Sequence, residues 1–202
     1  DCAVVDFGTY ECVMSTDPIT AAVGDIGRLA IHISCNDIAS NGVEPLGIML
    51  TVMLPEGTTT ADVEEIMTQA AAASEALGVE IIGGHTEITS AVNKPIIVST
   101  AIGRGEKWAS KHREAMKPGD FILLTKAAGL EGTAIIASDY EKDLAGILTA
   151  KELEQAKAMM DQVSVVKEGI IAGQIGTSGM HDITEGGVLG AVWEMCRRGD
   201  VG

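Results

Sequence analysis

The chain of 202 residues is 46% hydrophobic and 21% charged, which is enough apolar content for one domain with a real core or for two small domains. Its formal net charge of −15 and its pI of about 4.5 repel polyanions, and only 3% of its residues are aromatic. We therefore expect no nucleic-acid partner and no anionic membrane surface as a partner.

The four cysteines are dispersed and form no C-x-x-C pair, which argues against a structural zinc site. Dispersed thiols in apolar runs predict a reduced, cytoplasmic protein. No apolar run approaches the ~18 residues that a membrane-spanning helix needs. Because the chain begins at Asp1 rather than Met, we expect its natural N-terminus and any targeting signal to be missing.

Hydrophobic periodicity predicts strands and helices that alternate, which favours an α/β or α+β fold. The strands are expected at residues 2–7, 10–16, 45–54, 79–83, 95–103 and 120–125. The helices are expected at residues 25–41, 60–77, 130–139, 150–162, 165–173 and 187–198. The polar stretch 104–120 contains the turn Lys117-Pro118-Gly119-Asp120, where we place a domain boundary. The expected domains are residues 1–117 and 118–202.

The helix expected at 25–41 carries a carboxylate in its core-facing stripe. That stripe consists of Ile26, Leu29, Ala30 and Ile33. At ~100° per residue, Asp37 lies about 20° from Ile26, shortly before Gly42 ends the helix. A buried, unpaired carboxylate is costly, so Asp37 is expected to be neutral, paired or bound to a cation. A structural acid paired with a backbone donor or a lysine is the competing interpretation.

Three further acids stand beside expected element ends, namely Asp17, Glu87 and Asp182. Each alone is explained as a turn or cap residue. Together they suggest one polar cleft, because α/β folds build ligand sites from side chains at strand ends. If the ligand is anionic, a cation must intervene in so acidic a protein, and carboxylate oxygens with phosphates favour Mg²⁺.

Two glycine-rich segments could present backbone N–H groups to an anion. Gly83-Gly84-His85-Thr86-Glu87 is expected to be a turn after a strand, and Gly186-Gly187 is expected to open a helix. The chain contains no G-x-x-x-x-G-K-[ST] and no G-x-G-x-x-G that opens a helix, so P-loop and dinucleotide-binding folds lack support. It also contains no G-x-S-x-G and no H-E-x-x-H.

Seen together, the short motifs resemble the aminoimidazole-ribonucleotide (AIR) synthetase superfamily, and most of all its hydrogenase-maturation dehydratase branch, HypE. The motifs keep the family's order: DCAVV at 1–5, STD at 15–17, GDIGRLA at 24–30, NDIA at 36–39, GVEPL at 42–46, GGHTE at 83–87, KPGD at 117–120 and DITEGG at 182–187. The resemblance implies an N-terminal α/β domain whose sheet joins a barrel at a homodimer interface. Part of a C-terminal α/β domain, truncated here, would follow it.

The resemblance also implies ATP in a cleft between the domains, held through Mg²⁺. The residues carried over as metal ligands are Asp1, Asp17, Asp37 and Asp182, with Glu87 as a conjectural addition. The expected nucleotide contacts are Asn36, Gly83, Gly84, Thr86, Gly186 and Gly187, and the expected catalytic residues are Asp37 and His85. Two positions depart from the common pattern, where Cys2 and His85 replace acids. A neutral imidazole bonded to backbone remains an equal interpretation of His85.

The implied activity is ATP-dependent activation of a substrate oxygen by phosphoryl transfer, as in the dehydration of a protein thiocarboxamide during hydrogenase maturation. Such an enzyme would have a maturation partner protein besides its own second copy. Two alternatives remain open at this point. One is a small-molecule kinase or synthetase of the thiamine-monophosphate kinase or selenophosphate synthetase type. The other is a nucleotide-binding scaffold that has lost turnover.

Overall fold

The computed structural model describes residues 2–21, 24–106 and 115–202. Within these residues, one sheet has the strand order β1-β2-β5-β3-β4. Its strands are β1 (Ala3–Asp6), β2 (Tyr10–Ile19), β3 (Pro45–Leu54), β4 (Glu80–Ile88) and β5 (Ile96–Glu106). The neighbouring strands are antiparallel except for β3 and β4, which are parallel.

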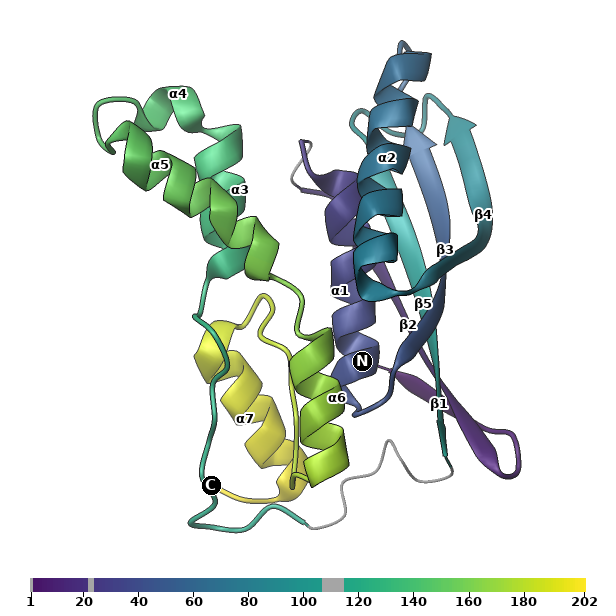
Figure 1. Ribbon diagram of the computed structural model, residues 1–202, viewed down its shortest axis with the longest axis vertical. Coiled ribbons are helices and arrows are strands. Elements are labelled where there is room, and N and C mark those ends of the chain that lie inside the picture. Colours follow the sequence, from purple (N-terminus) through teal and green to yellow (C-terminus); the bar gives the residue numbers. More distant parts are fainter. Residues whose placement is uncertain (1, 22–23, 107–114) are drawn as a thin grey trace.

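Two helices, α1 (Ile26–Ser40) and α2 (Thr60–Leu77), cover one face of this sheet (Figure 1). The parallel pair β3 and β4 needs a crossover connection, and α2 supplies it. Thr59 and Asp62 form a capping box at the start of α2, and Gly78 ends the helix in the left-handed conformation, with φ of 68°. The local sequence therefore fixes both ends of this helix.

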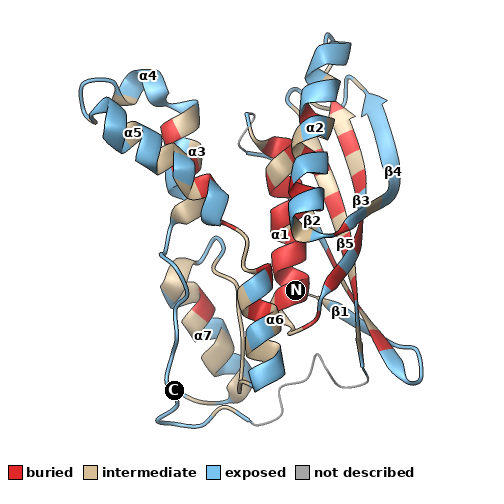
Figure 2. Cartoon of the chain, in the orientation of Figure 1, coloured by how far each residue is buried: buried red, intermediate tan, exposed pale blue. Residues whose placement is uncertain are grey.

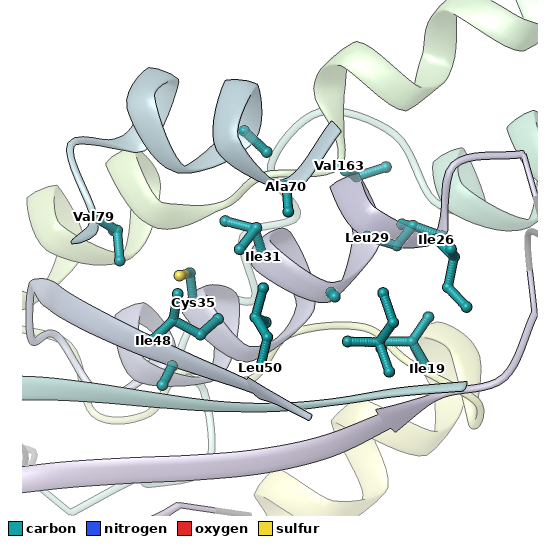
Figure 3. Packing of buried hydrophobic residues seen from close by; sticks show 14 of the residues in the cluster. Ile19, Ile26, Leu29, Ile31, Cys35, Ile48, Leu50, Ala70, Val79 and Val163 are labelled. Atoms are coloured by element: carbon teal, nitrogen blue, oxygen red, sulfur yellow. The ribbon is translucent and has the colours of Figure 1, made fainter. Parts of the chain in front are cut away.

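Helix α1 is buried on almost every side, so it is less one-sided than its apolar stripe predicts. Twelve of its fifteen residues are buried (Figure 2). It lies so close to α2 that a Cβ atom at Gly27 would overlap the carbonyl oxygen of Ile66. On its sheet side, Ile31 and Cys35 join Leu50 of β3 in the main core (Figure 3). Any polar residue on α1 must therefore find a partner inside the molecule.

The second half of the chain is helical in the part that the structure describes. Its elements are α3 (Leu130–Asp139), α4 (Glu141–Leu144), α5 (Ala150–Lys157), the 3₁₀ helix η1 (Ala158–Gln162), α6 (Val166–Ile175) and α7 (Gly187–Gly199). Helix α6 packs directly against the C-terminal part of α1, where a Cβ atom at Gly169 would overlap the carbonyl oxygen of Ala39. Among the described residues, no helix is both long and apolar enough to span a bilayer.

The mixed α/β fold expected from the sequence is confirmed, with two corrections in the second half. The strand predicted at 120–125 is wrong, because these residues belong to no helix or strand and no described segment pairs with them. The side chains of Phe121 and Leu123 are accordingly 96% and 89% exposed. The helix predicted at 150–162 is divided, since its last residues tighten into the 3₁₀ helix η1, as helix ends often do.

Candidate functional site

Asp37 lies in the last turns of α1 and is only 8% exposed. Its carboxylate oxygen Oδ2 accepts a hydrogen bond of 2.5 Å from the hydroxyl of Ser15 on β2. Ser15 faces α1 because side chains alternate along a strand, and its neighbours Val13 and Asp17 two residues away face the same side. Among the described residues, no lysine or arginine forms an ion pair with Asp37, whose hydrogen-bond donor is a serine hydroxyl instead.

Asp17 is the second acid beside Ser15. The Ser15 Oγ lies 3.2 Å from the Oδ2 of Asp17. It lies inside β2 rather than after it, because the strand continues through Pro18 to Ile19. Strand β1 pairs only with residues 11–14 of β2, so Pro18 is on an uncovered edge where its missing N–H is tolerated. The Ser15 hydroxyl carries one hydrogen and can donate to only one of the two carboxylates at a time.

The two carboxyl groups both have raised pKa values, and burial is the largest cause for each. Burial, followed by the hydrogen bond and charge of Asp37, raises the pKa of Asp17 from 3.8 to about 6. Burial also raises the pKa of Asp37, as does the negative charge of Asp182, while hydrogen bonds from Ser15 and Asp17 partly oppose that rise. Acids that are half-deprived of water and close to one another favour a shared proton or a bound cation.

Asp182 brings a third carboxylate from the far end of the chain. Its side chain is 13% exposed, and its charge acts on both Asp37 and Cys2. The neighbouring His181 ties this segment to α7, because its Nε2 lies 2.6 Å from a carboxylate oxygen of Glu194 and its Nδ1 lies 2.5 Å from the backbone oxygen of Asp182. We call Asp17, Asp37 and Asp182 the acid cluster.

Cys2 lies beside the acid cluster but cannot replace an acid in it at neutral pH. Its thiol donates a hydrogen bond of 3.3 Å to the backbone oxygen of Asp37. Burial, and then the charge of Asp37, raise the thiol pKa to about 11, so the thiol stays protonated. Asp1, the predicted metal ligand next to it, lies outside the described residues.

The segment from Gly83 to Glu87 is not the predicted turn, because it lies inside β4. The pairing with β3 shifts register at the start of this segment and then continues through it, with Met49 opposite Gly83 and Leu50 opposite Gly84. A Cβ atom at Gly84 would overlap the carbonyl oxygen of Leu50, so the glycine there serves close strand packing. The strand predicted at 79–83 is therefore too short, because β4 continues through these glycines to Ile88 although glycine usually ends a strand.

This β4 segment (residues 83–87) is separate from the acid cluster. β4 is the third strand across from β2, which places it roughly 14 Å away at the usual strand spacing. Gly83, Gly84, His85 and Thr86 line a hollow of about 200 Å³ that Met67 of α2 also borders. His85 and Glu87 face each other, with 3.6 Å between Nε2 and Oε2. Glu87 is therefore not brought to the acids that it was expected to join.

Asn36 makes contacts other than those expected. Its Nδ2 donates to the backbone oxygen of Val163 at 3.0 Å, and its Oδ1 accepts from the backbone N–H of Val165 at 2.8 Å. Both ends of the amide are thus engaged within the protein. Gly186 and Gly187 are placed as predicted, at the first turn of α7, where no side chain caps the helix.

Sequence reasoning missed Ser15, the residue that bridges the two acids. The period of two along β2 was a sufficient signal, because Ser15 and Asp17 stand two residues apart and must share a face. The described His, Cys, Asp and Glu side chains contain no group of three or more arranged to hold a metal by themselves. Proteins usually bind Mg²⁺ through one or two carboxylates, while the substrate's phosphates and water complete the coordination.

Comparison with known families gives two matches that together cover most of the chain. Residues 1–105 match the N-terminal domain of AIR synthase related proteins. Residues 117–202 match the C-terminal domain of the same family.

Individual relatives point in the same direction. A hydrogenase expression/formation protein of Methanocaldococcus jannaschii is 29% identical over all of this chain and 59% of its own length. The carbamoyl dehydratase HypE of Rhizobium leguminosarum is 29% identical over 94% of this chain and 54% of its own length. A crystal structure of the hydrogenase maturation protein HypE in complex with ATP is 29% identical, covers 64% of this chain and 41% of the solved one, and has a TM-score of 0.58. The chain thus spans little more than half the length of these curated relatives.

Proposed function

Because the chain belongs to the family of AIR synthase related proteins, we propose that it binds ATP through Mg²⁺ at the acid cluster. The whole protein would be a HypE-like enzyme that activates a substrate oxygen by phosphoryl transfer. Support for this comes from the similarity to carbamoyl dehydratases and to a HypE structure that contains ATP. The remaining support comes from the chemistry of the acids themselves.

One observation carries the metal proposal: Asp17 and Asp37 share a single serine hydroxyl, and the pKa of each carboxyl is raised. A divalent cation would relieve this repulsion, and hard carboxylate oxygens are the ligands that Mg²⁺ prefers. Asp182 would add a third oxygen donor, as would Asp1. When bound, Mg²⁺ would neutralise phosphate charge at the position where phosphoryl transfer occurs.

The protein's own residues would hold the nucleotide around this metal. Helix α7 has 13 residues and no side-chain cap among the described residues, so its N-terminal first turn suits an anionic phosphate. The N–H of Gly187 itself already donates to the carbonyl oxygen of Thr184 at 3.0 Å. The hollow beside Gly84 and Thr86 is a second candidate contact, at the β4 edge of the sheet and on the face that α2 covers. In this arrangement residues 1–117 supply two acids and residues 118–202 supply the third, so the site joins the two proposed domains.

We also propose that the protein forms a homodimer through the sheet face opposite α1 and α2 (Figure 1). That face exposes Tyr10, Leu46 and Met49, each of them 45% exposed. Tyr10 and Leu46 also line a hollow of about 280 Å³. Apolar sheet faces of this kind need a partner in solution. A second, non-identical partner would be a maturation protein that presents the substrate. Light scattering at micromolar concentration tests the homodimer, and a monomeric mass would contradict it.

Isothermal titration of ATP into the protein tests the metal proposal. We expect binding in the presence of Mg²⁺ and a loss of affinity of tenfold or more in EDTA, on the order of 1.4 kcal/mol. Equal affinity in both buffers would refute the carboxylate–metal site, even if ATP binds. Phosphate release on addition of a thiocarboxamide substrate would then separate an enzyme from a nucleotide-binding scaffold.

A further inference from the structure

Asn36 joins two parts of the chain that are far apart in sequence. Its side chain, only 6% exposed, bonds to the backbone of Val163 and Val165, which lie 127 and 129 residues further along. Residues 163–165 lead directly into α6, which packs on α1. We call the two hydrogen bonds of Asn36 the amide bridge.

The amide bridge requires the chemistry of asparagine. One partner is a carbonyl oxygen, which needs a donor, and the other is an N–H group, which needs an acceptor. An aspartate would set a carboxylate oxygen against the Val163 carbonyl, and an apolar side chain would leave both backbone groups buried without a partner. Either change carries the cost of an unsatisfied buried polar group.

Neighbouring contacts hold the same segment in register. The ammonium group of Lys126 contacts the backbone oxygen of Ser164 and lies 3.0 Å from a carboxylate oxygen of Glu168. The missing side chain at Gly169 lets α6 approach the backbone of Ala39. Among these contacts, the amide bridge is the one made by the residue directly before Asp37.

Asn36 and Asp37 are consecutive on α1 and therefore point about 100° apart around the helix. Asp37 faces β2, while Asn36 faces residues 163–165, from which the chain runs through α6 to Asp182. The same turn of α1 thus holds one acid of the cluster and anchors the segment that leads to another.

We propose that Asn36 is a positioning residue that fastens residues 163–165 to α1 and so holds Asp182 opposite Asp37 for binding of the metal–nucleotide complex. The family resemblance led us to expect a nucleotide contact from Asn36, whereas the structure gives its amide a contact within the protein. This inference rests on the proposed function of the acid cluster. Its first test, however, needs no nucleotide.

The first test is hydrogen exchange at the Val165 amide, whose hydrogen bond acceptor is Asn36 Oδ1. In Asn36→Ala, the Val165 amide should exchange at least tenfold faster than in the wild type. The matched control is Ser34→Ala, which removes a buried hydroxyl of α1 whose partner, the Ser99 hydroxyl at 2.6 Å, lies within the first half. That variant should leave Val165 exchange unchanged. Equal exchange at Val165 in the wild type and Asn36→Ala would overturn the amide bridge.

The second test uses MgATP, and coupling must act in both directions. Asn36→Ala should weaken MgATP binding about tenfold while Ser34→Ala weakens it less than about twofold, a difference within the usual range of coupling between sites. Equal losses in the two variants would show that Asn36 is merely structural.

If Asn36→Ala does not fold, hydrogen exchange in the wild type tests the proposal instead. Saturating MgATP should slow exchange at the Val165 amide but not at the Val79 amide, which donates to the backbone oxygen of Ser74 within the first half. Unchanged Val165 exchange at saturation would overturn the proposal. If the wild type binds no MgATP at all, the proposed function fails, and the exchange result for Asn36→Ala still stands by itself.

Discussion

The acid cluster and the β4 segment were expected to form one site, yet the structure gives them different environments. Asp37 is buried and shares a serine hydroxyl with Asp17, whereas His85 and Glu87 lie exposed on an edge strand. The acids are crowded and have raised pKa values, which is a reason to bind a cation. The glycines of β4 are explained by strand packing before any ligand is invoked. A motif shared with a family therefore does not identify by itself what each of its residues does.

The largest expected effect separates the two glycines of the β4 segment. Gly84→Ala should lower the free energy of unfolding by roughly 3 kcal/mol, because the new methyl group would overlap the Leu50 carbonyl and push β4 away from β3. Gly83→Ala is the matched control, since no atom of the described residues lies within 4 Å of its Cβ position, and only backbone strain of about 1 kcal/mol is expected there. Urea melts measure both. Equal losses would show that the close approach at Gly84 does not govern stability.

The next effect concerns the acid cluster. Asp37→Asn keeps the shape of the side chain and removes its charge, so MgATP affinity should fall at least tenfold, on the order of 1.4 kcal/mol. The metal-free variant should be as stable as the wild type or more so, because repulsion with Asp17 and Asp182 is relieved. A variant that loses roughly 3–5 kcal/mol of stability and still binds MgATP normally would instead identify Asp37 as a structural acid.

Asp17 should make the metal-free protein less stable as the pH rises. Its folded-state pKa of about 6 exceeds the ordinary 3.8, so the folded protein holds a proton that the unfolded chain has already released. This contribution is present below pH 3.8, falls as the pH rises to about 6 and is constant above it. Allowing for the partial exposure of Asp17, it is on the order of 1 kcal/mol.

Urea melts in EDTA at several pH values, on the wild type and Asp17→Asn, isolate this contribution from the general effect of the protein's negative charge. The difference in stability between the two proteins should change across this window, and saturating Mg²⁺ should abolish the change. A constant difference would mean that Asp17 titrates normally.

The smallest expected effect is at His85. In the absence of nucleotide, His85→Asn should change the affinity for Mn²⁺, a spectroscopic substitute for Mg²⁺, by less than about twofold, because sites this far apart act independently. Asp17→Asn should lower the same affinity several-fold. Comparable losses in both variants, measured by the electron paramagnetic resonance signal of free Mn²⁺, would unite the two regions into one metal site.

The sequence predicts the elements of this protein well where local signals are strong. The bounds expected for β3, α2 and α3 agree with the structure to the residue, and α2 shows why, because its capping box and terminal glycine mark both ends. The strand expected at 120–125 fails because an apolar run becomes a strand only when a partner strand lies beside it. The turn expected at Gly83 fails because tertiary pairing with β3 overrides the preference of glycine for turns.

The candidate site shows a similar limit. Periodicity places Asp37 in the core, and the structure agrees, but α1 is so widely buried that its stripe alone could not say which side Asp37 faces. The hydrogen bonds of Asn36 could not be predicted from its sequence neighbours, since its partners stand more than 120 residues away along the chain. The position of Ser15, in contrast, could be predicted from the alternation of side chains along β2, which places it on the same face as Asp17.

Paramagnetic broadening by Mn²⁺ tests the central claim most directly, because it reports where the metal sits. Substoichiometric Mn²⁺ with ATP should broaden the NMR amide signals of Asp17, Asp37 and Asp182 first, before those of His85 and Glu87. Asp37→Asn should remove this selectivity while the spectrum of the folded protein stays intact. Broadening that begins at His85 and Glu87 and spares Asp37 would contradict the assignment of the metal–nucleotide site to the acid cluster.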